Sequence, residues 1–216
     1  MLEKMDGFFT ARVDGYDEHM KSTIEGATSF YKFTASLLPT EKNAKVLDLG
    51  CGTGLELEEY FSVNPQADVT GIDLTEVMLE SLKEKFPDKN IITICGSYFD
   101  VPFREELFDA AVSVESLHHF TKEEKISLYT KLRNALKPGG YFILTDYFSE
   151  SDEQENDFQQ ELFRIRKEQN VSDDIFYHYD TPLTVEHEKE ALLSAGFTQV
   201  EEVDSWGVTH TLKAVR

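Results

Sequence analysis

A regular alternation of short apolar runs with helical stretches, between residues 45 and 147, constrains the fold more than any other feature of this chain. The runs are apolar throughout, which is typical of strands that helices cover on both faces. Strands joined through helices form right-handed crossovers and therefore a parallel sheet. We predict an α/β fold with strands at 45–49, 68–73, 91–95, 108–114 and 141–147.

Helices are indicated by apolar spacing and by residues that favour helix ends. We predict them at 21–38, 55–61, 76–86, 121–137, 151–169 and 185–195. Thr121 and Glu124 have the spacing of a capping box at the start of the fourth of these helices. Two final strands, at 199–205 and 209–215, are separated by only a few residues, so we expect an antiparallel hairpin.

The first strand leads into a glycine-rich turn in the stretch VLDLGCGTG, which begins at Val46. A dinucleotide fingerprint would need a further glycine or alanine where Leu55 stands, and a phosphate-binding P-loop would need a lysine that is missing. Asp48 would repel a pyrophosphate, whereas Asp73, which ends the next strand, is suited to accept both hydroxyls of a ribose. Together they favour an adenosine-like ligand with a cationic tail.

Six segments in order then resemble one known family. They are VLDLGCGTG, GIDLTEVML, CGSYFDVPF, FDAAVSVESLHHF, LRNALKPGGYFILTDY and EKEALLSAGFTQVEEV. Over residues 44–216 the chain resembles a class I S-adenosylmethionine-dependent methyltransferase of the small-molecule type. The resemblance implies a Rossmann-like, doubly wound sheet of seven strands, parallel except for the last strand, in the order 3-2-1-4-5-7-6. It also implies an enzyme that transfers a methyl group from S-adenosylmethionine and releases S-adenosylhomocysteine.

The resemblance implies that the glycine turn holds the methionine part of the cofactor. Gly50, Gly52 and Gly54 would let the backbone approach the ligand closely, and Cys51 lies within the same turn. Asp48 would orient the turn and meet the amino group of the ligand, directly or through water.

The adenosine part would contact residues that follow the second and third strands. Asp73 would hold the ribose diol, and Leu74 would lie against the adenine with Met78 nearby, although both apolar residues also fit an ordinary core. Ser97 and Tyr98 would contact the edge of the adenine. Many family members have an aspartate where Ser97 stands, and a serine hydroxyl bonds the adenine more weakly than a carboxylate does.

The methyl donor and its acceptor would meet after the fourth strand, at Glu115. His118 and His119 follow, and either is a candidate base for an acceptor hydroxyl, or else one packs locally and the other is solvated. In the N-terminal segment, Tyr16 and Arg12 would touch the methionine end of the cofactor. Alternatively, Tyr16 is an aromatic residue that only packs against its neighbours.

We predict one methyltransferase domain over residues 1–216. It would comprise a helical cover at 1–40, a cofactor-binding core at 41–148, an insertion at 149–183 over the acceptor pocket, and a helix and hairpin at 184–216. Aromatic residues at 176–179 would form either a wall of the acceptor pocket or a packed loop. The apolar residues of the preceding helix are expected to form its buried stripe: Phe158, Leu162, Phe163 and Ile165.

Composition narrows the choice of partners. The chain has 41 acidic and 21 basic residues, a net charge of −20, which disfavours nucleic acid because phosphate contacts need clustered Lys and Arg. The chain has two cysteines and no closed zinc motif, so we expect no disulfide framework and no metal. It has no signal peptide and no apolar run of membrane length, so we expect a cytoplasmic location. The expected partner is a small-molecule acceptor, and the expected state a monomer or homodimer. A tRNA or protein methyltransferase, a non-catalytic S-adenosylmethionine-binding protein and another S-adenosylmethionine-using transferase or synthase remain alternatives.

Overall fold

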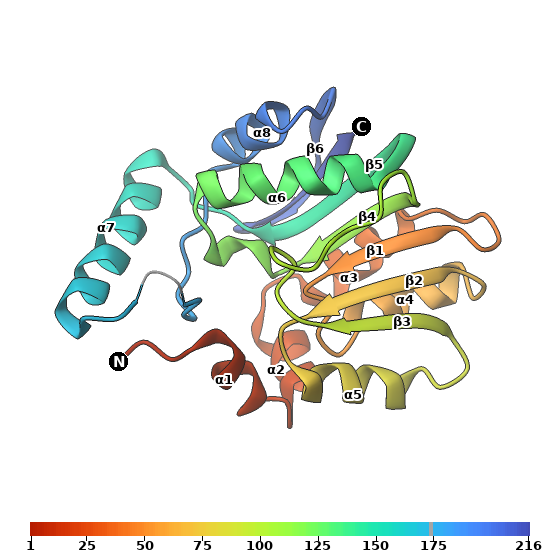
Figure 1. Cartoon of the computed structure of the whole chain (residues 1–216), viewed down its shortest axis with the longest axis horizontal. Helices are drawn as coiled ribbons and strands as arrows, with labels where there is room; N and C mark the ends of the chain where they lie inside the picture. Colours follow the sequence, from red (N-terminus) through yellow and green to blue (C-terminus); the bar gives the residue numbers. More distant parts are fainter. Residues whose placement is uncertain (173–174) are drawn as a thin grey trace.

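A computed structural model describes residues 1–172 and 175–216 of the chain (Figure 1). Its strands form one seven-stranded sheet in the order β3-β2-β1-β4-β5-β7-β6, and β7 runs antiparallel to both of its neighbours. This confirms the predicted fold class and strand order. The strands are β1 (Lys45–Leu49), β2 (Asp68–Asp73), β3 (Asn90–Cys95), β4 (Phe108–Val114), β5 (Leu136–Tyr147), β6 (Gln199–Trp206) and β7 (Thr209–Val215).

Helices cover the two faces of the sheet. The side chains of α3, α4 and α5 pack into one core cluster, and those of α6 and α8 pack into the other (Figure 1). The helices are α1 (Met5–Thr10), α2 (Tyr16–Thr23), α3 (Ala27–Ser36), α4 (Leu55–Val63), α5 (Glu76–Lys85), α6 (Lys122–Ala135), α7 (Asp152–Gln169) and α8 (Val185–Ser194). A 3₁₀ turn, η1 (Leu117–His119), follows β4, and no helix of the described residues is long and apolar enough to cross a membrane.

The N-terminal region differs from the single helix predicted at 21–38. The structure has two helices there, α2 and α3, which are separated around Gly26. Gly26 has a φ of 75°, and a Cβ atom at this position would lie 2.6 Å from Cβ of Trp206. The break therefore comes from a left-handed backbone and a close tertiary contact, which helical spacing in the sequence does not reveal.

The insertion contains α7, which lies apart from the sheet (Figure 1). The prediction of a buried stripe on this helix is wrong for Phe163, which is 71% exposed, while Phe158, Leu162 and Ile165 are only half-buried. The reason is that α7 contacts the N-terminal segment, the loop before α8 and Tyr147 at the end of β5 rather than a face of the sheet. Residues 173 and 174 of the predicted insertion lie outside the described residues.

The N-terminal segment pairs with the insertion in a short antiparallel contact. The amide of Met5 donates to the carbonyl of Phe176 at 3.0 Å, and the amide of His178 donates to the carbonyl of Glu3 at 3.0 Å. The rings of Phe8 and His178 stack with centroids 3.5 Å apart. We call the paired residues 3–8 and 176–178 the clasp. The clasp places α1 over the carboxyl ends of the central strands.

A buried ion pair joins α6 to α8. Lys125 Nζ lies 2.5 Å from Glu188 Oε2, both side chains are almost fully buried, and the hydroxyl of Tyr129 also donates to Glu188. Thr121 and Glu124 form the predicted capping box at the start of α6. These contacts fix the helix directly after η1, and so they fix the turn that carries His118 and His119.

Candidate active site

Two adjoining cavities lie at the carboxyl ends of the central strands, where open α/β sheets bind ligands. The first has an empty volume of about 610 Å³ and is lined by residues that follow β1, β2, β3 and β4, together with α1 and the insertion. The second has an empty volume of about 1720 Å³ and lies between the N-terminal helices, η1, the insertion and the β6–β7 hairpin. Four residues line both cavities: Phe9, Tyr16, Glu115 and His119.

The predicted glycines have different places around the first cavity. Gly50 and Gly52 line it, while Gly54 begins α4 with a φ of 76°. A Cβ on Gly50 would lie 2.1 Å from Ser116 Oγ, so this glycine is needed for packing between β1 and β4. No atom lies within 4 Å of a Cβ added to Gly52, so this position leaves space. Cys51 is buried and does not line either cavity.

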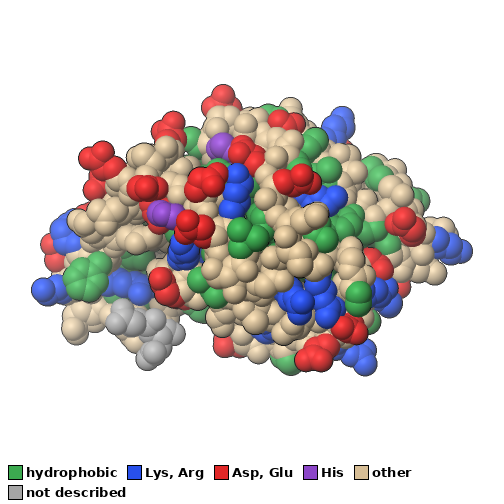
Figure 2. Space-filling model, turned by 90° about the horizontal axis from the view of Figure 1, so that it is seen from above, with side chains coloured by type: hydrophobic (Ala, Val, Ile, Leu, Met, Phe, Trp, Pro, Cys, Tyr) green, Lys and Arg blue, Asp and Glu red, His purple; other side chains and the backbone are tan. Residues whose placement is uncertain are grey.

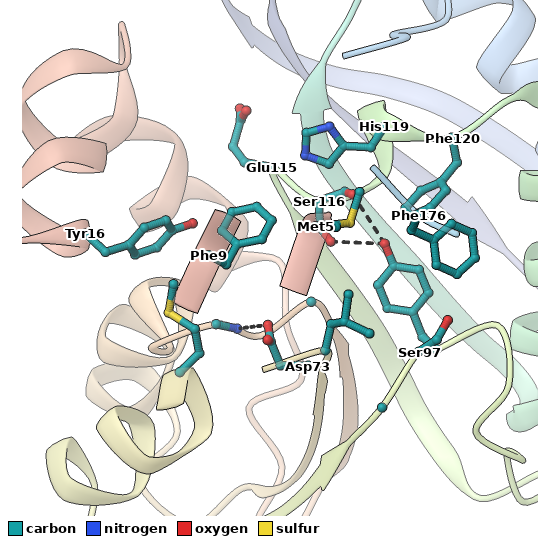
Figure 3. Close-up of a pocket in the computed structure, with 16 residues that line it drawn as sticks. Met5, Phe9, Tyr16, Asp73, Ser97, Glu115, Ser116, His119, Phe120 and Phe176 are labelled. Carbon is teal, nitrogen blue, oxygen red and sulfur yellow. Dashed lines mark hydrogen bonds between the residues drawn. The ribbon is translucent and has the colours of Figure 1, made fainter. Parts of the chain in front are cut away.

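Asp73 organises the glycine turn. Its Oδ2 accepts a hydrogen bond from the amide of Gly52 at 2.9 Å (Figure 3). Its Oδ1 accepts from the amide and the hydroxyl of Thr75 at 2.9 Å each. Burial raises the pKa of Asp73, whereas these donors favour its ionised form. The carboxylate lines the first cavity, and the lone pair that these bonds leave over is available to a ligand.

Asp48 lies behind the glycine turn and does not line the cavities. It is fully buried beside Glu56 of α4, and neither of its oxygens has a hydrogen-bond partner among the described residues. Burial, followed by the charge of Glu56, raises the pKa of Asp48 well above its usual range, and burial also raises the pKa of Glu56. The sequence indicated the aspartate of this acid pair but not the glutamate.

The other predicted adenosine contacts line the first cavity together. They are Leu74, Met78, Ser97 and Tyr98. The hydroxyl of Ser97 accepts a hydrogen bond from the amide of Phe99 at 3.2 Å, and the hydroxyl of Tyr98 lies 3.3 Å from both oxygens of Ser116. Tyr98 is therefore held by a neighbour across the carboxyl end of the sheet, and Ser97 by a bond within its own turn.

An apolar cover closes the first cavity, and most of it was not predicted. Phe9 and Tyr16 lie on one side of the view in Figure 3, and Phe120 and Phe176 lie on the other. The ring of Phe176 packs against that of Phe120, with centroids 5.3 Å apart. The pair FF in the first helix was a readable signal for an apolar cover, but the position of Phe176 depends on the path of the insertion.

The second cavity contains a cluster of histidines and carboxylates. His118 Nδ1 lies 2.5 Å from Asp146 Oδ1, and His118 Nε2 lies 3.6 Å from Asp180 Oδ1. His119 Nδ1 lies 3.1 Å from the same oxygen of Asp180. Asp146 was missed, although it is the second-last residue of β5, which lies beside β4, and aligning the carboxyl ends of neighbouring strands could have found it.

The two histidines have opposite electrostatic surroundings. Burial lowers the pKa of His118, but the charge and hydrogen bond of Asp146 outweigh burial and raise it to about 9. Burial, together with the charge of His118, lowers the pKa of His119 to about 4. The pair is thus one imidazolium and one neutral imidazole near neutral pH.

Glu115 lies between the two cavities in a strained position. Its φ of 49° is left-handed, and its Oε1 accepts a hydrogen bond from the hydroxyl of Thr209 at 3.0 Å. Burial and the charge of Asp146 raise the pKa of Glu115 to about 7. Strained backbone in a non-glycine residue is often found at functional sites.

The remaining predicted residues divide between the two cavities. Arg12 lines only the second cavity, where its guanidinium lies 3.6 Å from the ring centroid of Phe8 and 3.1 Å from Glu3. Of the aromatic residues at 176–179, Phe176 lines the first cavity and His178 the second, whereas Tyr177 is buried and pairs with Lys4.

The face of the molecule that Figure 2 shows carries acidic and basic side chains interspersed with one another. This is the face on which α8 lies. It has the mixed charge of a solvated surface rather than the continuous basic stripe that a nucleic-acid backbone requires.

Comparisons with known proteins agree on one family. Residues 46–140 match the model of a family described as a methyltransferase domain. The chain is 28% identical over 153 residues to 24-methylenesterol C-methyltransferase 3 of Arabidopsis thaliana, covering 67% of this chain and 42% of that protein. It is 33% identical over 100 residues to probable tRNA methyltransferase 9B of Mus musculus, covering 46% of this chain and 21% of that protein. The chain therefore spans less than half the length of these relatives.

The fold has solved counterparts. The crystal structure of human N-acetylserotonin methyltransferase in complex with S-adenosylmethionine matches with a TM-score of 0.68 and 17% identity, over 98% of this chain and 56% of that one. This likeness and the strand order show the class I methyltransferase fold.

Proposed function

We propose, from the premise that residues 46–140 belong to the methyltransferase domain family, that this chain transfers a methyl group from S-adenosylmethionine to a small-molecule acceptor. The observation that carries the proposal is the pair of adjoining cavities, with Glu115 and His119 lining both. A donor in the first cavity and an acceptor in the second would meet at these residues. The product left in the first cavity would be S-adenosylhomocysteine.

The first cavity has features that suit this donor. Its lining combines apolar side chains such as Leu74 and Met78, which suit an adenine ring, with the polar Asp73 and Ser97. Gly52 leaves space where a side chain would project, and Asp73 retains a lone pair for a ribose hydroxyl. The buried Asp48–Glu56 pair behind the turn offers no positive charge to a pyrophosphate.

The protein's contribution to the chemistry would be alignment and exclusion of water. S-adenosylmethionine supplies a methyl group that is already activated by the positive sulfonium. The cover of Met5, Phe9 and Phe176 shields the first cavity, so the donor would be held away from bulk water. His118 and His119 line the second cavity, and of the two only His119, the neutral imidazole, could accept the proton of an acceptor hydroxyl.

A small acceptor agrees with the second cavity, which aromatic side chains enclose together with the histidine cluster. A tRNA acceptor has support from the relative named a probable tRNA methyltransferase, which matches over 100 residues. The net charge of −20 counts against that acceptor, because RNA binding requires clustered Lys and Arg. A non-catalytic S-adenosylmethionine-binding protein would bind the donor without turnover.

Calorimetry with S-adenosylhomocysteine tests the donor assignment. We expect wild type to bind, and Asp73→Ala to bind about 10–100-fold more weakly, because one charge-assisted hydrogen bond, worth about 1.5–3 kcal/mol, would be lost. Asp68→Ala is the matched control, since Asp68 begins the same strand and pairs with Lys45 at the end of the sheet opposite to the cavities. Equal affinity in wild type and Asp73→Ala would show that the ribose assignment is wrong.

A methyl-transfer screen tests the reaction itself. Metabolite mixtures and tRNA are incubated with the protein and S-adenosylmethionine, and release of S-adenosylhomocysteine is measured. We expect release with a small-molecule fraction and not with tRNA. Unchanged turnover in both His118→Ala and His119→Ala would rule out any role of the histidines at the acceptor.

A further inference from the structure

Three potential metal ligands converge on the floor of the second cavity. His118 Nε2 and His119 Nδ1 lie 3.6 and 3.1 Å from the same oxygen, Oδ1 of Asp180. The ligand atoms of the three residues all lie within 4.8 Å of one another. We propose that His118, His119 and Asp180 bind one divalent transition-metal ion such as Zn²⁺.

The spacing of these atoms fits a shared ion. Ligands that each lie about 2.0–2.2 Å from a metal are separated by about 3.0 Å at right angles and about 3.4 Å at a tetrahedral angle. Both measured separations from Asp180 are close to these values. His119 Nδ1 also lies 3.3 Å from the carbonyl oxygen of Tyr179, and metal binding would replace this contact.

The surroundings of His118 provide the outer contacts that metal-bound histidines usually have. Its Nδ1 is paired with Asp146 at 2.5 Å, which leaves Nε2 to face Asp180. Carboxylates in this position fix the ring and the tautomer of a ligand histidine. Asp146 Oδ2 also accepts from the amide of Leu117, and the amide of Thr181 donates to the carbonyl of His118 at 2.7 Å. The backbone on both sides of the cluster is therefore held in place.

Charge also favours a cation here. The ion pairs of Asp180 and Asp146 are with imidazoles, and Asp180 Oδ1 is a buried oxygen without a well-aligned hydrogen bond in the described part of the chain. Glu115, His118 and Asp146 form a second overlapping group whose ligand atoms lie within 4.8 Å. Three carboxylates thus surround two buried histidines, and the cluster is open to solvent on the side of Asp180, whose side chain is 42% exposed.

The ligand set indicates the class of metal. Two imidazole nitrogens and one carboxylate suit Zn²⁺, Fe²⁺ or Co²⁺, whereas Mg²⁺ and Ca²⁺ prefer oxygen ligands. Three protein ligands leave at least one position open, which is typical of catalytic rather than structural sites. All three ligands line the second cavity, so the open position would face an acceptor.

If the proposed methyl transfer is correct, the ion would activate an acceptor hydroxyl. Coordination would lower the pKa of the hydroxyl, and its proton would pass to solvent. The oxygen would then form a bond to the methyl carbon while the carbon–sulfur bond breaks, and the electron pair of that bond would remain on sulfur. The histidines would then act on the acceptor through the metal rather than as bases.

Titration of ZnCl₂ into chelator-treated protein, followed by calorimetry, tests the site without any activity assay. We expect one ion per chain. Asp180→Asn and His119→Ala should weaken binding by more than 100-fold, and Asp146→Asn by about 10–100-fold, as for other outer contacts of metal sites. His210→Ala is the matched control, because His210 also pairs with a carboxylate, Glu202 at 2.7 Å, but lies outside the cluster.

Absence of stoichiometric binding to wild type, or equal binding by wild type and Asp180→Asn, would overturn the metal site. A Co²⁺-loaded wild type should show visible absorption bands that Asp180→Asn lacks, and melting curves confirm that each variant folds. S-adenosylhomocysteine binding separates the two proposals. Asp73→Ala should lose the nucleoside but retain Zn²⁺, and Asp180→Asn should do the reverse.

Discussion

The two cavities are built in different ways. The first is lined mainly by turns that directly follow β1 to β4, so its shape depends on backbone positions and on short sequence motifs. The second collects side chains from the N-terminal helices, η1, the insertion and the last hairpin. A sheet fixes the ends of its neighbouring strands, whereas a cavity between separate segments depends on how each segment packs. The first cavity, which we propose as the donor half, is therefore defined locally, and the second, proposed as the acceptor half, by tertiary structure.

The strongest test of this difference is Gly50→Ala. A Cβ there would meet Ser116 Oγ at 2.1 Å in a backbone with a φ of 73°, so we expect a loss of about 2–4 kcal/mol in unfolding free energy. Urea unfolding measures the loss, and adding Ser116→Gly should recover part of it. Gly52→Ala is the control, because it adds only the backbone strain of about 1–2 kcal/mol. Similar losses in the two variants would contradict the close approach.

A smaller effect is expected at the acid pair behind the glycine turn. Burial raises the pKa of Asp48 and of Glu56 above their usual range, so the folded protein keeps a proton that the unfolded chain releases at lower pH. Stability should therefore fall as pH rises from the usual carboxyl range toward the folded pKa. Glu56→Gln should raise the melting temperature at pH 8, by the equivalent of about 1 kcal/mol, and change little near pH 4.

The control for this prediction is Glu58→Gln on the same helix, where the side chain is exposed and pairs with Lys21. Its effect should stay within about 0.5 kcal/mol at every pH. If Glu56→Gln is instead destabilising at pH 8, the buried carboxylate has a stabilising partner and the acid pair is not a source of strain.

The smallest effect concerns the clasp, which contributes Phe176 to the first cavity and His178 to the second. Phe8→Ala removes the stacking on His178, which is worth about 0.5–1.5 kcal/mol. Dissociation of S-adenosylhomocysteine, followed by stopped flow, should accelerate by roughly 2–10-fold. Phe163→Ala, on the exposed face of α7, should leave the rate unchanged. An unchanged rate in Phe8→Ala would show that the donor cavity opens independently of the insertion.

The sequence predicts the sheet and the donor half because their signals are local. The apolar runs define the strands, and the glycine turn with Asp73 falls at two adjacent strand ends, where parallel pairing brings them together. The sequence does not show that Gly50 is tightly packed while Gly52 has space, because this difference depends on Ser116 in the turn after β4. Glu56 was missed because a glutamate in a first helical turn is usually solvated.

The acceptor half was harder to predict because its partners are far apart along the chain. His118 and His119 were identified, but Asp180 reaches them only through the path of the insertion, and no spacing in the sequence indicates this. The expectation of no metal also came from spacing along the sequence, which does not indicate ligands that only the fold brings together. Arg12 lies beside the second cavity rather than the first because its guanidinium packs on Phe8.

The clasp has a further consequence for the order in which the molecule assembles. Lys4 and Tyr177 are joined by a bridge across most of the chain, so this contact closes a very long loop. Loop closure of this length costs conformational entropy, which the hydrogen bonds and ring contacts of the clasp must offset. During synthesis the first residues must wait until the insertion has emerged, so the cover over the donor cavity forms late. In the finished protein the same contact should be among the first to open, and amide hydrogen exchange there should outpace exchange in the sheet.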